Sequence, residues 1–152
     1  SDYVVVIYDF VPGDSLELLI EKKGPFSLEA VLKMAVELCE AASALHQRDI
    51  VHRDIAPGNI VVSADGVHLK IWEIARFRIE GASKDTASLG TWGFASPEQY
   101  GFAQTDARSD VYSIGRVLGY GLTGLLPGSD EYDRAFAGDA LEPSVRALIE
   151  KA

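Results

Sequence analysis

The stretch IVHRDIAPGNIVV, residues 50–62, leaves few options for the local fold, because a polar loop is bounded on both sides by short apolar runs. The second run predicts a strand at Ile60–Val62. Asp65-Gly66 then predicts a tight turn, so His68–Ile71 should return antiparallel to that strand. The sequence therefore predicts a polar loop that leads directly into a β-hairpin.

Two helices are predicted before this loop. In GDSLELLIEKKG, Asp14 or Ser15 would be the N-cap and Gly24 would end the helix. From Ser27 onward, apolar residues recur on one helical face over about five turns. The positions on that face are Leu28, Val31, Leu32, Ala35, Leu38, Cys39, Ala42 and Leu45.

A third helix is predicted in SDVYSIGRVLGYGLTG, residues 109–124, with Ser109 as its N-cap. Gly115, Gly119 and Gly121 each destabilise a helix by up to roughly 1 kcal/mol relative to alanine. Close packing against another backbone would offset that loss. With further helices expected up to the C-terminus, the predicted fold class is mainly α (α+β), with the short hairpin beside the polar loop.

The beginning of the chain, YVVVIYDF, predicts a strand at Tyr3–Tyr8 that ends before Pro12-Gly13. An apolar, uncharged strand of this kind is an open template for pairing. We therefore expect residues 3–8 to be covered by a protein partner, either a distinct protein or a second copy of the chain in a homodimer. Residues 75–96 show no periodicity, which is typical of a functional loop.

The composition narrows the class of partner. The 152 residues suit one domain, and 14 Lys+Arg against 23 Asp+Glu give a formal net charge of −9. That charge argues against binding to nucleic acid or to an anionic membrane surface. No apolar run of about 18 residues and no signal peptide is seen, so the expected location is cytoplasmic. The single cysteine, Cys39, lies among apolar residues and is predicted to be a buried, inert thiol.

The polar loop contains Asp54 and Asn59, five residues apart. A carboxylate at such a position can orient or deprotonate a hydroxyl group, and an amide oxygen can bind a hard cation. The alternative is an ordinary turn with a structural Arg-Asp pair.

Four stretches in the right order resemble the eukaryotic-type serine/threonine protein kinases. The loop matches the catalytic motif H-R-D-x-x-x-x-N at His52, Arg53, Asp54 and Asn59. GTWGFASPEQ resembles the end of an activation segment, and SDVYSIG resembles the start of a central helix in which Asp110 would brace the catalytic loop. VVVIYDFVPGDSL resembles the hinge that contacts the adenine of a nucleotide, which implies hinge roles for Tyr8, Asp9, Phe10 and Val11.

The resemblance implies that residues 1–152 form the C-terminal lobe of a kinase without its N-terminal lobe. Its segments would be a hinge strand at 3–11, the catalytic loop at 52–59, a degenerate DFG motif at 73–75, an activation segment at 76–98 and the central helix at 110–123. The glycines near the start make no G-x-G-x-x-G, and no V-A-I-K-like stretch exists.

The metal site also departs from the family. Glu73, Ile74 and Ala75 align with the family's Asp, Phe and Gly. Because Mg²⁺ tolerates little deviation from octahedral geometry, Asn59 and Glu73 are expected to bind a cation only weakly. The implied cofactors, ATP with Mg²⁺ or Mn²⁺, are therefore expected to bind this chain weakly or not at all.

The activation segment supplies further candidate residues. Arg53 would pair with a phosphorylated residue of this segment, and the candidates are Thr86, Ser88 and Thr91. Arg76 and Arg78 are positive charges near these candidates. An equally favoured alternative is that Arg53 pairs with backbone carbonyl groups. By resemblance, Thr91 contacts Asp54 rather than carrying phosphate. Glu98 lacks the arginine that the family provides for it and would find another partner, such as Arg146, or remain exposed. His46 and His68 are interpreted as ordinary surface or partly buried residues.

Three functions remain open. The favoured one is a catalytically silent pseudokinase that binds or regulates other proteins. The second is a fragment of a serine/threonine kinase that needs an N-terminal lobe supplied from elsewhere. The third is a nucleotide-sensing domain without turnover.

Overall fold

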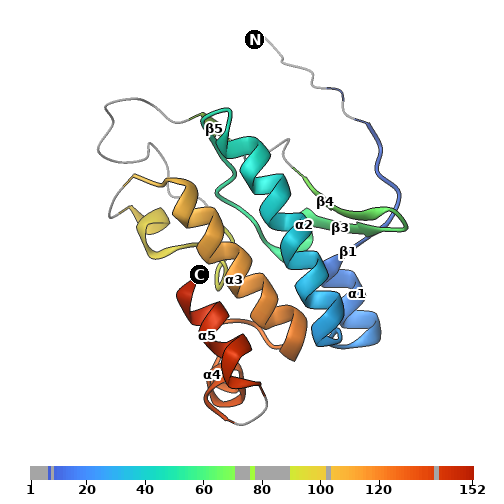
Figure 1. Cartoon of the computed structure of the whole chain (residues 1–152), viewed down its shortest axis with the longest axis vertical. Coiled ribbons are helices and arrows are strands. Elements are labelled where there is room, and N and C mark those ends of the chain that lie inside the picture. The colour runs from blue at the N-terminus through green and yellow to red at the C-terminus, as the bar shows by residue number, and fades with distance from the viewer. Residues whose placement is uncertain (1–6, 8, 71–75, 78–89, 102–103, 139–140) are drawn as a thin grey trace, which may run out of the picture.

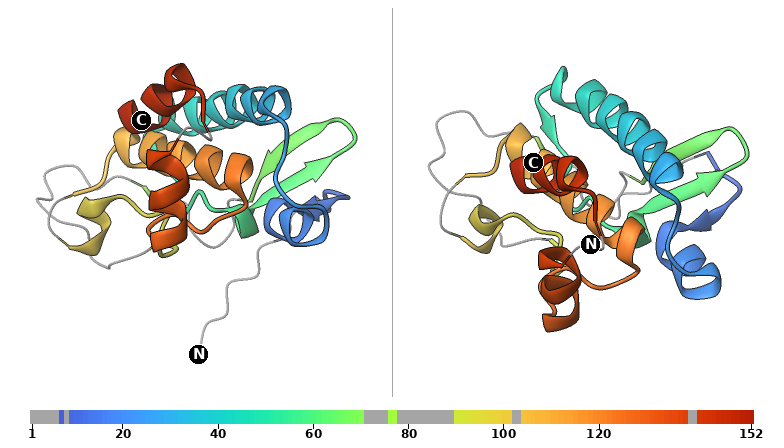
Figure 2. Two further views of the ribbon diagram at one scale, coloured as in Figure 1. Left: turned by 90° about the horizontal axis from the view of Figure 1, so that it is seen from below. Right: turned by 60° about the horizontal axis from the view of Figure 1, so that its bottom comes forward.

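The computed structural model describes residues 7, 9–70, 76–77, 90–101, 104–138 and 141–152. The long helices α2 (Leu28–His46) and α3 (Ala107–Thr123) lie side by side at the centre (Figure 1). The hairpin and α1 (Leu16–Lys23) lie at one end of this pair, and the loop around residues 90–100 lies at the other (Figure 2). The mainly α fold with a small sheet is confirmed.

Serine side chains start the first two helices. Ser15 Oγ accepts a hydrogen bond from Leu18 N at 3.2 Å, and Ser27 Oγ accepts one from Ala30 N at 3.3 Å. Ser15 rather than Asp14 is therefore the cap of α1, and Gly24, with φ of 80°, ends that helix as predicted.

The buried face of α2 is narrower than the predicted one. Val31, Met34, Leu38 and Ala42 are buried in the core between α2 and α3. Leu28 and Leu32 are more than one third exposed, and Cys39 is exposed rather than buried. The prediction of a buried thiol was wrong because Cys39 lies outside the strip of α2 that faces α3.

The helix α3 begins earlier than predicted. Asp106 is its N-cap and accepts a hydrogen bond from Arg108 N at 2.8 Å. Ser109 is instead fully buried inside the helix, where its Oγ donates to Glu98 Oε1 at 2.6 Å. Its partner is thus a side chain from a distant segment, not the helix backbone.

The glycines of α3 pack closely, but the predicted approach to another backbone is found at Gly115 only, while Gly119 and Gly121 pack against side chains. A Cβ on Gly115 would meet Ala152, one on Gly119 would meet the Tyr132 hydroxyl, and one on Gly121 would meet Val31. Tyr132 belongs to α4 (Asp130–Ala137), and Ala152 directly follows α5 (Pro143–Lys151). These glycines let α3 approach three other helices, including α2 through Val31.

The predicted hairpin is confirmed. β3 (Ile60–Ser63) pairs antiparallel with β4 (Gly66–Leu69), and Ser63 lies opposite Gly66 across the turn. β1 (Asp14–Ser15) adds a short third strand on the other side of β3. Separately, β2 (Ile50–Val51) pairs with β5 (Arg76–Phe77). The short 3-10 helices η1 (Pro57–Asn59) and η2 (Pro97–Tyr100) complete the described elements.

The predicted N-terminal strand lies mostly outside the described residues. Residues 7 and 9–12 are described, and they belong to no strand. Ile7 is 91 % exposed and Phe10 is 88 % exposed. Within the described part of the chain, no helix has the length and apolar character needed to cross a membrane.

Candidate active site

The polar loop is attached to α3 by one buried carboxylate. Asp110 is fully buried in the first turn of α3. Its Oδ2 accepts a hydrogen bond from His52 N at 2.9 Å, and its Oδ1 accepts one from Arg53 N at 2.9 Å. Asp110 therefore holds the start of the loop through main-chain amides.

Arg53 carries an unusual backbone conformation at this point. Its φ of 71° lies in the left-handed region, which is unfavourable for a residue with a side chain. The Arg53 amide bonds to Asp110, and its carbonyl accepts a hydrogen bond from Gln99 Nε2 in η2. These two bonds stabilise a conformation that the residue alone would not favour.

His46 is a residue of the site that the sequence reasoning missed. Its Nε2 lies 2.7 Å from Asp110 Oδ2, and its side chain is 20 % exposed. His46 occupies the last turn of α2, a few residues before the loop. Its partner Asp110 is 64 positions away, so no local signal in the sequence indicates this contact.

His52 joins the loop to the hairpin. Asp54 N donates to His52 Nδ1 at 3.2 Å, so Nε2, 2.7 Å from Lys70 O, carries the ring proton. Burial lowers the pKa of the His52 imidazole below its ordinary value, although the Lys70 carbonyl and the charges of Asp110 and Asp54 act in the opposite direction. His52 is thus a neutral bridge in the interior.

The Asp54 carboxylate is oriented on both sides. Its Oδ2 accepts a hydrogen bond from Asn59 Nδ2 at 2.9 Å. Its Oδ1 accepts bonds from Thr91 N at 2.8 Å and from Thr91 Oγ1 at 2.6 Å. The fold therefore brings together residues 54, 59 and 91, including the Thr91 contact that the resemblance implied.

Asn59 keeps one polar atom available. The Asn59 Nδ2 atom also donates to the backbone carbonyl of Asp54 at 3.0 Å. The backbone carbonyl of Asn59 accepts a hydrogen bond from Lys70 N at 2.9 Å. Its Oδ1 receives no hydrogen bond from the described residues and could serve as one oxygen ligand for a hard cation. Glu73, the second predicted ligand, lies outside the described residues. Within the described ranges, no three His, Cys, Asp or Glu side chains are grouped to hold a metal ion.

The comparison with known families fits this geometry. A family model described as "Protein kinase domain" matches residues 1–147. The chain belongs to the protein kinase family. Asp54 and Asn59 both lie within the residues that match this family model.

Individual relatives agree with this assignment. Serine/threonine-protein kinase PknB of Mycobacterium tuberculosis is 36 % identical over 126 residues, which is 80 % of this chain and 20 % of that protein. Probable serine/threonine-protein kinase PkwA of Thermomonospora curvata is 35 % identical over 119 residues, 78 % of this chain and 16 % of that protein. Probable serine/threonine-protein kinase CPE1738 of Clostridium perfringens is 32 % identical over 156 residues, 100 % of this chain and 22 % of that protein. The chain thus spans about one fifth of the length of these kinases.

Glu98 of this kinase-family chain has a partner other than the suggested Arg146. Its Oε1 accepts from Ser109 Oγ, whereas Arg146 donates to the carbonyl groups of Ala137 and Gly138. Burial alone would raise the pKa of Glu98, but hydrogen bonds from Ser109, Ser96 and its own backbone outweigh it and lower the pKa. The ionised carboxylate therefore ties η2 to α3.

The chain contains one sequence with the spacing G-x-G-x-x-G, Gly119–Gly124. These residues form the end of α3, and Gly124, with φ of 69°, is its C-cap. A glycine-rich loop that binds phosphate instead follows a strand or opens a helix, where free N–H groups point at the ligand. This stretch is therefore a helix-packing element of the kinase fold.

The remaining predicted residues divide into two groups. Asp9, Phe10 and Val11 are described, and they form no hinge strand. Tyr8, Glu73, Arg78, Thr86, Ser88 and the side chain of Arg76 lie outside the described residues.

Proposed function

We propose that this kinase-family chain binds protein segments that carry a hydroxyl group at the Asp54 loop and does not transfer phosphate by itself. The observation that carries the proposal is that the only G-x-G-x-x-G of the chain is the end of α3, while Asp54 is well oriented. The oriented carboxylate supplies an acceptor for a hydroxyl proton. The one glycine-rich spacing of the sequence therefore lies in a helix and not in a loop that could cover the phosphates of a nucleotide.

Phosphoryl transfer depends on positioning and on neutralising the phosphate charge. In the kinase family, a lysine and a glycine-rich loop contribute to both, and this sequence contains no V-A-I-K-like stretch. Glu73, aligned with the family's metal-binding aspartate, is one methylene longer, which disfavours the strict geometry of Mg²⁺. Both features favour a pseudokinase that binds or regulates proteins.

The test for transfer uses radiolabelled ATP, Mg²⁺ or Mn²⁺, and a serine- and threonine-containing protein such as casein. We expect the same background for the native chain and for Asp54→Asn. Asp65→Asn, a change of an exposed carboxylate in the hairpin turn, is the matched control. Label that enters the substrate with the native chain and Asp65→Asn, but not with Asp54→Asn, would refute the proposal.

The test for binding uses fluorescein-labelled peptides with a single serine and anisotropy as the signal. We expect saturable binding that is weakened about tenfold by Asp54→Ala, because a hydrogen bond to a charged group is lost. The same change should have no effect on a peptide in which alanine replaces serine. Equal binding of both peptides to the native chain would argue against recognition of the hydroxyl group.

A second function, a fragment of an active serine/threonine kinase, is favoured by the intact hydrogen bonds among Asp54, Asn59 and Thr91. In that case an N-terminal lobe from elsewhere would provide the phosphate-binding parts. ATP with Mg²⁺ or Mn²⁺ would then be the cofactor, with Asn59 Oδ1 and Glu73 as cation ligands. Adding the corresponding lobe of a related kinase and recovering transfer would support this function.

A nucleotide-sensing domain is the third candidate, since Asn59 Oδ1 is not occupied by a described donor. A ligand that binds only the folded state raises its stability by RT ln(1 + [L]/Kd). A rise in the melting temperature with ATP and Mg²⁺, and no phosphate transfer, would favour the sensor. No rise is expected for the pseudokinase.

The N-terminal segment is part of the proposal as an interaction surface. The exposure of Ile7 and Phe10 supports a partner, either a second copy or another protein, that covers residues 3–8. Size-exclusion chromatography with light scattering distinguishes these cases. A monomer at high concentration that captures no partner would count against this surface.

A further inference from the structure

A small hollow opens next to the Asp54 site, between the loop that follows Thr91 and the helix α3. Its volume is about 280 Å³, and the side chains that define it are Trp92, Ala95, Pro97, Tyr100, Tyr112 and Arg116. We call it the Trp92 hollow. Trp92 is 59 % exposed and Tyr100 is 49 % exposed, so two large aromatic side chains are partly open to solvent.

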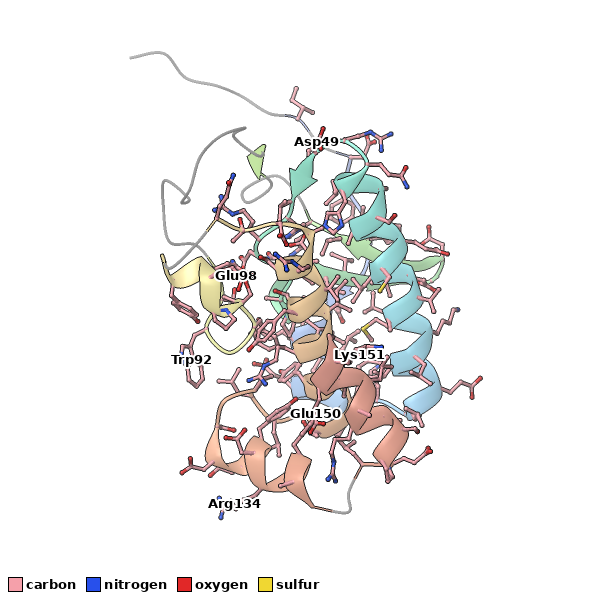
Figure 3. The ribbon with its side chains drawn as sticks, turned by 60° about the vertical axis from the view of Figure 1, so that its left-hand side comes forward. Asp49, Trp92, Glu98, Arg134, Glu150 and Lys151 are labelled. Atoms are coloured by element: carbon pink, nitrogen blue, oxygen red, sulfur yellow. The ribbon has the colours of Figure 1, made fainter. Side chains whose placement is uncertain are left out.

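The Trp92 hollow begins one residue from the Asp54 contact. Thr91 donates to Asp54 through its amide and its hydroxyl group, and Trp92 is the next residue in the chain. Figure 3 shows the Trp92 side chain at the edge of the molecule, pointing away from the fold. A segment held at Asp54 therefore has its neighbouring residues within reach of this hollow, because an extended chain advances about 3.3–3.6 Å per residue.

Arg116 gives the hollow a fixed positive charge. Its Nε donates to the Gly93 carbonyl at 3.0 Å. Its Cζ lies 5.3 Å from the ring centre of Tyr132 and 5.8 Å from that of Tyr112. These contacts set the direction of the guanidinium group before any ligand binds.

The terminal nitrogens of Arg116 have no acceptor in the described part of the chain. The contacts of Arg116 there are the Gly93 bond and the two aromatic rings, and no carboxylate pairs with it. A guanidinium group with free N–H donors matches the two oxygens of a carboxylate. An apolar ligand would cover these donors without bonding to them, which is unfavourable, and a cationic ligand would be repelled.

The overall negative charge of the chain does not remove this local preference. The net charge is −9, but charges on the surface are screened beyond about 8 Å at physiological ionic strength. A direct contact with Arg116 is shorter than that distance. The aromatic side chains beside it would pack on the aliphatic stem of a bound acidic residue.

We propose that the Trp92 hollow binds the carboxylate of an aspartate or glutamate in the protein segment whose serine or threonine lies at Asp54. This inference rests on the proposed function, because it names the class of segment that the site selects. Arg116 is the residue that recognises the charge. The partner is thus an acidic segment close to a hydroxyl residue.

The first experiment measures the preference on the native chain. Fluorescein-labelled peptides carry one serine and, one or two positions to either side, Glu, Gln, Lys or phosphoserine. We expect at least one Glu peptide to bind about 3- to 10-fold more tightly than its Gln counterpart, and the Lys peptide to bind more weakly than either. The inference is overturned if the Glu peptide binds no more tightly than the Gln peptide at any position. It is also overturned if only the phosphoserine peptide binds more tightly.

The second experiment assigns the preference to Arg116. Arg116→Gln should abolish the difference in affinity between the Glu and Gln peptides. Arg48→Gln is the matched control, because Arg48 is an exposed arginine two residues after the end of α2 and lies outside the hollow. A Glu preference that survives Arg116→Gln overturns the inference. Circular dichroism establishes that the Arg116→Gln chain is folded.

A third experiment needs neither the Arg116 variant nor binding at Asp54. The chain has two tryptophans, so Trp72→Phe leaves Trp92 as the only tryptophan reporter. We expect N-acetylglutamate amide at millimolar concentration to change the Trp92 emission saturably, and N-acetylglutamine amide to have no effect. Equal responses overturn the inference about the hollow. If the two responses are equal, serine peptides that bind through Asp54 would still support the proposed function. If the response is specific for glutamate but serine peptides do not bind, only the inference about the Trp92 hollow is supported.

Discussion

His46 and Asp110, which are 64 positions apart in the sequence, are joined by a contact of 2.7 Å between Nε2 and Oδ2. The same carboxylate accepts hydrogen bonds from the amides of His52 and Arg53. The end of α2, the start of the polar loop and the first turn of α3 therefore meet at a single side chain.

Replacing Asp110 should destabilise the chain strongly. Asp110→Ala leaves His46 and two backbone amides without their acceptor in a buried site, so we expect the free energy of unfolding to fall by about 3–5 kcal/mol. Urea denaturation followed by circular dichroism measures the change. Asp130→Ala, at an exposed position in the first turn of α4, should change it by less than about 1 kcal/mol. Similar losses for both variants would contradict this account.

The stability of the chain should fall as the pH drops below the ordinary pKa of histidine. Burial lowers the pKa of His52 in the folded state, so the unfolded chain takes up the proton first. The contribution of neutral His52 is complete above about pH 6.5 and is lost as the pH falls toward the lowered pKa. Urea unfolding between about pH 5 and 7.5 measures the slope. His52→Asn should reduce the slope of the free energy of unfolding against pH, and His68→Asn, in the hairpin, should leave the slope unchanged. The reverse result would exclude His52 as the source of the slope.

Gly119 should not tolerate a side chain while Tyr132 is present. The Cβ of Gly119→Ala would meet the Tyr132 hydroxyl group, which is buried and has no hydrogen-bond partner among the described residues. We expect a loss of about 1–3 kcal/mol in the free energy of unfolding, part of which Tyr132→Phe restores. A double-mutant cycle by urea denaturation gives the coupling between the two changes. Gly58→Ala, whose Cβ would lie 3.3 Å from the flexible Glu17 side chain, is the control and should cost less than about 1 kcal/mol.

Cys39 should react in the folded chain, but slowly at neutral pH. The thiol is exposed, yet partial burial raises its pKa above the ordinary value of a cysteine, so little thiolate is present at neutral pH. We expect one thiol per chain to react with an aromatic disulfide reagent without denaturant, at a rate that rises roughly tenfold per pH unit between about pH 7 and 8.5. A thiol that reacts only after urea is added would show that it is buried.

Local signals in the sequence predicted the elements that depend on local chemistry. The turn at Asp65-Gly66 and the cap at Ser27 are set by residues next to them in the chain, and both lie where expected. The order of the motifs, from His52 to Asp110, was likewise enough to identify the family.

Predictions that depended on contacts between distant segments were less successful. Ser109 and Asp106 are both suitable N-cap residues, and only the contact of Ser109 with Glu98 decides between them. The face of α2 that contains Cys39 is apolar in sequence, yet α3 covers only part of it. The partner of His46 is a residue of another helix, so no local pattern could identify it.

The bonds from Asp110 to the amides of residues 52 and 53 have an evolutionary consequence. Main-chain amides are present whatever side chain occupies a position, apart from proline. Descendants of this chain could therefore exchange the side chain at position 54 and keep both bonds to Asp110, while the contacts of Asp54 with Asn59 and Thr91 would be lost. The backbone of this loop and its reactive side chains can therefore change independently during evolution. A chain that kept the backbone would be free to acquire new ligands after an ancestral reaction had been lost.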